Sequence, residues 1–156
     1  MPHGRWTVEL ARWSQGENTM TRLRTRFRTR QPMTLLVYRE NRFYRALKAM
    51  GMQDITVPSP DLDRQYIVRS DRPAIAQSLL IDSIIARSLV ALRKGRFEVA
   101  RERRNLRLSD VSEVRWAASG TIKDAEMLDH AVALVRAGID GLHRLGAANE
   151  PVMDDD

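Results

Sequence analysis

Residues 21–30 read TRLRTRFRTR, and this stretch decides the fold. Arginine occupies every second position and alternates with threonine or an apolar residue. A helix would spread these arginines around its circumference, whereas a β-strand places alternate side chains on one face. The stretch therefore predicts a strand that is buried on one face and carries a row of arginines on the other. This arginine row consists of Arg22, Arg24, Arg26, Arg28 and Arg30.

The neighbouring segments predict two more strands. Trp6, Val8 and Leu10 alternate with other residues, which is the period of a half-buried strand, and residues 14–18 predict the hairpin loop that follows. Residues 33–38 are apolar on both faces, as expected for a central strand. We expect these three strands to form an antiparallel meander.

The rest of the chain predicts helices alternating with shorter strands. Residues 41–51 predict a short helix, 58–61 a turn-rich connector and 65–69 a fourth strand. A helical pattern then runs to Leu92 with a break near residues 82–83. Its expected buried stripe is Ile81, Ile84, Ile85, Leu89 and Leu92.

The C-terminal half predicts a second β region and a long helix. Residues 97–116 predict two or three strands, with a hairpin turn at residues 104–105. From Thr121 onward, apolar residues recur every three or four positions up to Leu142, which predicts the long last helix. Gly138 and Gly141 weaken that helix, which we interpret as a sign of close packing.

This order of elements indicates an α+β fold rather than the regular β-α alternation of a doubly wound sheet. We expect an antiparallel sheet of about six or seven strands, packed helices and a long C-terminal helix. A pleckstrin-homology-like roll is the alternative. Residues 1–148 are expected to form one domain, and residues 149–156 an acidic C-terminal tail.

Composition restricts the class of protein. The 156 residues contain no cysteine, which excludes disulfides, cysteine nucleophiles and thiolate metal sites. We find no run of 18 apolar residues and no apolar leader after Met1, so we expect a cytoplasmic protein that could lie against a membrane. The net charge of +6 favours an anionic partner. A genome rich in G and C would put arginine in place of lysine without any functional reason, so the abundance of arginine is weak evidence for that partner.

The arginine row has two interpretations. Guanidinium groups can bind phosphates or lipid headgroups through two parallel hydrogen bonds, so Arg22, Arg24, Arg26, Arg28 and Arg30 are the candidate anion-binding residues. Alternatively, the row is a solvated strand face with cross-strand partners such as Glu9. Nucleic-acid binding is a weaker hypothesis, because Phe27 is the row's one aromatic neighbour in this strand.

Metal and catalytic sites have little support in the sequence. Glu126 and His130 lie one helical turn apart but suggest no further ligand. The acidic residues around the fourth strand lack the spacing of a calcium loop, and we expect Asp63 to hold a turn. We expect no cofactor; an enzyme would need a composite site with Asp63, Asp71 and an unpaired arginine.

Residues 61–71, DLDRQYIVRSD, resemble the middle of a group of uncharacterised bacterial domains. In that group an acidic turn leads into a short strand, and a helix ending in paired leucines follows, here Leu79 and Leu80. Gly4-Arg5 ahead of the first strand is similar too, whereas Leu62 departs from the phenylalanine that the group tends to have. Members often carry membrane helices ahead of this domain, so the resemblance implies a juxtamembrane accessory domain without a known activity.

Together these features predict a non-catalytic binding or scaffolding domain. Its expected partner is an anionic membrane surface or a protein in an assembly. A nucleic-acid-binding module is the alternative function. The last helix could also pair with a second copy of the chain, although packing against the sheet is the commoner use of such a stripe.

Overall fold

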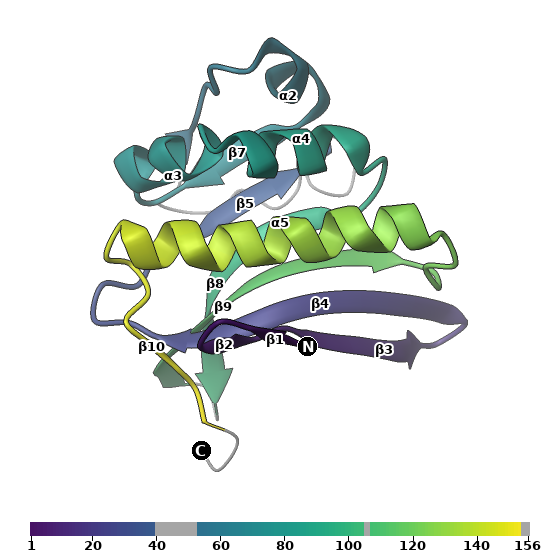
Figure 1. The fold of residues 1–156 in the computed structure, drawn as a ribbon, viewed down its shortest axis with the longest axis horizontal. Helices are drawn as coiled ribbons and strands as arrows, with labels where there is room; N and C mark the ends of the chain where they lie inside the picture. The colour runs from purple at the N-terminus through teal and green to yellow at the C-terminus, as the bar shows by residue number, and fades with distance from the viewer. Residues whose placement is uncertain (40–52, 105–106, 154–156) are drawn as a thin grey trace.

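A computed structural model describes residues 1–39, 53–104 and 107–153 of the chain (Figure 1). Its main sheet contains eight strands. They are β3 (Glu9–Gln15), β4 (Asn18–Arg28), β5 (Leu35–Tyr38), β6 (Gln53–Asp54), β7 (Ile67–Ser70), β8 (Arg96–Arg104), β9 (Arg107–Ser119) and β10 (Glu150–Pro151). The two-residue strands β1 (Pro2–His3) and β2 (Trp6–Thr7) pair separately. The helices are α2 (Pro60–Gln65), α3 (Pro73–Leu80), α4 (Ser83–Ala91) and α5 (Ala125–Arg144).

The main sheet is antiparallel and follows the order β10-β4-β9-β8-β5-β7-β6, with β3 also paired to β4. The α+β prediction, with its long last helix, is therefore confirmed. The linear order describes an open sheet, unlike the pleckstrin-homology-like roll kept as the alternative.

The predicted three-stranded meander is wrong at its second step. Strands β3 and β4 pair as expected, but β5 pairs with β7 and β8. The neighbour of β4 is β9, which aligns Leu23 with Trp116 and Arg26 with Glu113. The reason is length and charge: β9 spans 13 residues and supplies a carboxylate opposite an arginine, whereas β5 spans only 4.

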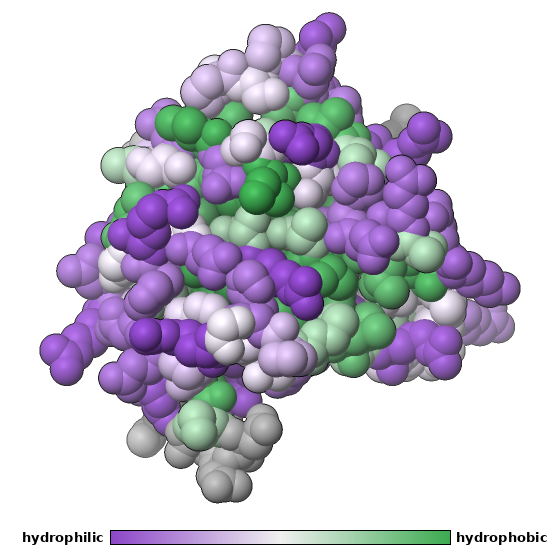
Figure 2. Space-filling view, in the orientation of Figure 1, coloured by the Kyte–Doolittle hydropathy of each residue, from purple (hydrophilic) through white to green (hydrophobic). Residues whose placement is uncertain are grey.

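The helices α3, α4 and α5 pack together and cover one face of the sheet (Figure 1). On that face β4 buries Leu23 and Phe27 as its alternation predicts. Helix α5 approaches β8 and β9 closely at Gly138, where an added Cβ would lie 3.0 Å from Val114 and 3.1 Å from Phe97. Close packing at this helical glycine is thus observed. In Figure 2, seen from the same direction, hydrophilic residues interrupt the apolar ones across the surface.

Two members of the predicted buried stripe are exposed. The side chains of Ile81 and Ile84 are 65% and 50% accessible, whereas Ile85, Leu89 and Leu92 are buried. The reason is the break between α3 and α4, which bends the chain by 78°. Asp82 caps the new helix by accepting hydrogen bonds from the N–H groups of Ile84 and Ile85. The break itself was predicted correctly.

Other segments differ from the sequence-based expectations. The connector at residues 58–61 contains the start of α2, which Ser59 caps, and β9 is one continuous strand. Residues 149–151 lie on the sheet instead of starting a tail: the Asn149 N–H donates to the Arg28 carbonyl, and β10 pairs with β4. The predicted helix at 41–51 lies entirely within residues 40–52, outside the described part of the chain.

Within the described ranges, no single helix is long and apolar enough to cross a membrane. Helices α3 and α4 reach that length only as a pair, and their 78° bend separates them.

The N-terminus of α5 offers a test of the helix layer. Asp124 accepts hydrogen bonds from the N–H groups of Glu126 and Met127 at 3.0 and 3.4 Å. We expect Asp124→Ala to lower the free energy of unfolding by about 1 kcal/mol in urea denaturation, because the first turn loses its acceptor. Asp124→Asn keeps an acceptor and should stay near the wild type. Equal losses in both variants would contradict this role of the cap.

Candidate functional site

The face of the sheet opposite α5 carries the arginine row, and we call it the charged face. Its charged residues come from β3, β4, β8 and β9, because residues aligned across antiparallel strands share a face. Arg24 lies between Glu9 and Arg115, and Arg26 lies beside Glu113. The charged face comprises Glu9, Arg22, Arg24, Arg26, Arg28, Glu98, Glu102, Glu113 and Arg115.

Carboxylates bind two members of the arginine row within this face. Arg24 Nε donates to Glu9 Oε2 at 2.8 Å, and its Nη1 donates to Glu113 Oε2 at 3.1 Å. Arg26 donates to Glu102 through Nε and Nη2 at 2.6 and 3.2 Å. These contacts are the cross-strand pairing that the second interpretation of the row predicted, including the Glu9 partner.

The carboxylates at the centre of the charged face are buried. Glu98 and Glu113 are only 4% and 3% exposed, and Arg115 donates to both of them. Burial opposes the charge of Arg24 and Arg115, but their hydrogen bonds and attraction to glutamates outweigh it and raise the pKa of both guanidinium groups. The central arginines therefore stay protonated and fixed in position, and the neighbouring carboxylates balance most of their positive charge.

Arg22 differs from its neighbours because it makes no ion pair with a described carboxylate. Its guanidinium carbon lies 5.2 Å from the centre of the Trp13 ring, and its Nε is buried without a hydrogen-bond partner. Burial lowers the pKa of Arg22, and the nearby charge of Arg24 lowers it further. Trp13 is 38% exposed. This pair forms an aromatic and cationic corner of the charged face.

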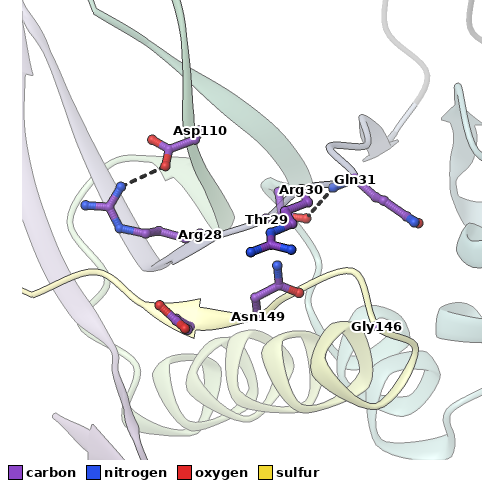
Figure 3. Close-up of a pocket in the computed structure, with 8 residues that line it drawn as sticks. Arg28, Thr29, Arg30, Gln31, Asp110, Gly146 and Asn149 are labelled. Carbon is purple, nitrogen blue, oxygen red and sulfur yellow. Dashed lines mark hydrogen bonds and ion pairs between the residues drawn. The ribbon is translucent and has the colours of Figure 1, made fainter.

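Arg28 and Arg30 reach a cleft of about 630 Å³ at the end of β4 (Figure 3). Arg28 Nη1 donates to Asp110 Oδ2 at 2.8 Å, and this bond lowers the pKa of the Asp110 carboxyl. Arg30 lies beyond the strand and points with Asn149 into the cleft (Figure 3). The lining includes Asp110 and Glu150, so its two carboxylates balance its two arginines.

The structure thus divides the arginine row into three environments. Arg24 and Arg26 belong to the ion-pair network, Arg22 stacks on Trp13, and Arg28 and Arg30 line the end cleft. The fold therefore does not present five free, parallel cations. Anion binding by individual arginines of the row stays a prediction.

A second cleft, of about 450 Å³, lies near the other end of β4, and the sequence reasoning missed it. We call it the basic cleft. Its lining contains four cationic side chains and no carboxylate among the described residues. They are Arg39, Arg93, Lys94 and Arg96. The signal that could have found it is the basic run RKGR at residues 93–96.

The acidic residues considered for metal binding are not gathered at one point. Asp63 lies in the first turn of α2 with an exposed side chain, and the cap of this helix is Ser59. Asp71 accepts a hydrogen bond from the Thr34 N–H at 2.7 Å, and Asp54 pairs with Arg69 at 2.8 Å. Within the described residues, no group of three His, Asp or Glu side chains is placed to hold a metal ion.

The fold and the charged face define an α+β protein with one helical layer and one open, ion-paired sheet face. No family model matches the chain, and no curated protein matches it. A solved structure that shares the fold is that of the mycobacterial trehalose monomycolate transport factor A, TtfA. Its TM-score is 0.51 at 10% identity, over 95% of this chain and 79% of that one. At this identity the likeness concerns the fold alone.

Proposed function

We propose that this chain is a non-catalytic binding domain that docks a partner protein on its charged face, as part of an assembly. The observation that carries the proposal is the charged face itself. Its guanidinium groups are held in fixed positions by carboxylates, and at one corner the exposed Trp13 stacks on the half-buried Arg22. Tryptophan and arginine are the residues that most often dominate the energy of protein interfaces.

The ion pairing favours a protein partner over an anionic membrane at this face. A lipid phosphate that bound Arg24 or Arg115 would have to displace Glu113, which is buried and would lose its partners. Leaving a buried charge unpaired is costly. A protein surface can instead add hydrogen bonds to the edges of the network without breaking it. The same reasoning weakens the nucleic-acid alternative, which needs free cations along the strand.

The resemblance of residues 61–71 to juxtamembrane domains supports an assembly at a membrane. The neighbour in fold is described as a transport factor, which agrees with a binding role and does not require catalysis. We therefore place the proposed assembly at the membrane surface, with the charged face turned toward its protein partner.

Site-specific photo-crosslinking in the native cells tests the proposal. A photoreactive amino acid at Ala11, which is aligned with Arg22, samples the charged face; one at the exposed Arg87 of α4 samples the helix layer. We expect a discrete crosslinked protein from position 11 alone. Adding Trp13→Ala should reduce its yield several-fold, because interface anchors contribute about 2 kcal/mol or more. The same products from both positions, or none from position 11, would contradict the proposal.

A further inference from the structure

We propose that the basic cleft binds a phosphate group. The inference goes beyond the docking role of the charged face and does not depend on it. The basic cleft is built at the turn between α4 and β8, where it adjoins the end of β9. The cations that line the basic cleft do not belong to the arginine row.

Gly95 makes the basic cleft possible. Its φ of +92° is a conformation that favours glycine, and an added Cβ would lie 2.6 Å from Trp116 Nε1 and 2.8 Å from the Ala117 carbonyl oxygen. The turn is therefore pressed against β9. This close approach places the flanking residues Arg93, Lys94 and Arg96 around one hollow.

Two cations of the basic cleft, Arg39 and Lys94, are held by neutral acceptors among the described residues. Arg39 Nη2 donates to the Leu92 carbonyl at 3.1 Å and to Gln65 Oε1 at 3.4 Å, and the guanidinium lies 5.3 Å from the centre of the Tyr66 ring. Lys94 Nζ donates to the Ser119 carbonyl at 3.0 Å. Such bonds fix a side chain without cancelling its charge, so positive charge persists in the basic cleft.

The other two cations of the basic cleft are Arg93 and Arg96, and they differ in their partners. Arg93 is exposed and pairs with no described carboxylate. Arg96 pairs with Glu98 at 2.9 Å and so belongs in part to the ion-pair network of the charged face. The other three cations of the basic cleft, Arg39, Arg93 and Lys94, make no ion pair with a carboxylate in the described part of the chain. An anion that entered the basic cleft would meet these donors in a preformed site.

Phosphate is the anion that this arrangement fits. It carries up to two negative charges and several acceptor oxygens, and the forked donors of arginine match its geometry. A cleft of about 450 Å³ also leaves space for the group that bears the phosphate. That group could be a lipid headgroup or a soluble phosphate ester, and both present the same chemistry to the cleft.

The test compares two double variants with equal losses of charge. Arg93→Ala/Lys94→Ala removes two cations from the basic cleft, whereas Arg5→Ala/Arg87→Ala removes two exposed arginines elsewhere. In one arm, inorganic phosphate is titrated while NMR follows the Gly95 amide and the Trp116 indole N–H. In the other arm, the chain is sedimented at 0.15 M salt with phosphatidylcholine vesicles that contain or lack phosphatidic acid.

We expect wild-type binding in at least one arm, with about a tenfold or greater loss in the cleft variant and little change in the control. Binding of free phosphate without vesicle binding would support a soluble ligand. Phosphatidic-acid-dependent sedimentation would support a headgroup. The proposal is overturned if the wild type binds neither probe, or if both double variants weaken binding equally, as a diffuse charge effect would. The basic cleft adjoins the charged face through Arg96, but the two tests change different residues: Arg93 and Lys94 for phosphate, and Ala11 and Trp13 for the protein partner. Failure of one proposal therefore leaves the other standing.

Discussion

Glu113→Ala should lower the free energy of unfolding by about 3–5 kcal/mol, the typical cost of removing one partner from a buried ion pair. The Glu113 side chain is 4% exposed and accepts hydrogen bonds from Arg24 and Arg115. Without it, two arginines at the centre of the charged face lose a shared counter-charge. Urea denaturation, followed by circular dichroism, measures the change in midpoint.

Glu9→Ala is the matched control for Glu113→Ala. Glu9 also binds Arg24, at 2.8 Å, but its side chain is 38% exposed and lies on an edge strand. Exposed ion pairs contribute about 1 kcal/mol or less, so the midpoint should move only slightly. Equal destabilisation by the two substitutions would show that burial does not decide the strength of this network.

Gly95→Ala should destabilise the fold by about 2–5 kcal/mol. A residue with a Cβ pays about 1–2 kcal/mol for the left-handed backbone. The clash with Trp116 and the Ala117 carbonyl, at 2.6 and 2.8 Å, adds about 1–3 kcal/mol, because a backbone atom and a buried ring cannot easily move. Thermal denaturation followed by circular dichroism would report the loss.

Gly120→Ala separates the two contributions. Gly120 has a φ of +89°, close to that of Gly95, but the nearest atom to its added Cβ is Lys94 Nζ at 3.5 Å. It should therefore show the backbone cost without the clash. If both alanine variants lost the same stability, the close approach of the turn to β9 would not contribute.

The local structure was predictable wherever a pattern was strong. The alternation at residues 21–30 predicted β4, and the apolar spacing after Thr121 predicted α5. Strand pairing was not predictable, because periodicity defines the face of a strand but not its neighbour. Only the fold shows that Leu23 aligns with Trp116, far along the chain. The exposure of Ile81 and Ile84 was not predictable either, because it depends on the three-dimensional path of the chain. A 78° bend between α3 and α4 turns these two residues away from a stripe that is continuous in the sequence.

The candidate site was predictable only in part. The sequence identified the arginine row and proposed Glu9 as a partner, which the structure confirms for Arg24. It could not place Glu113 or Glu102 beside the row, because Glu113 lies on β9, which pairs with β4, and Glu102 lies on β8, which pairs with β9, and both strands are distant from β4 in the sequence. The basic cleft was missed for a similar reason. Arg39 and residues 93–96 are distant in sequence, and the pairing of β5 with β8 brings them together beside the Gly95 turn.

The pairing of β4 with β9 also affects how the chain folds during synthesis, because the ribosome makes β4 long before β9. Strand β4 emerges early but must wait until residue 119 has been made before its partner is complete. At ordinary rates of synthesis the wait lasts on the order of ten seconds. During it, β4 is paired with β3 along one edge, but the edge that β9 will cover stays open, and open strand edges promote aggregation. The alternating arginines repel a second such strand, so they protect the nascent chain before they stabilise the finished sheet.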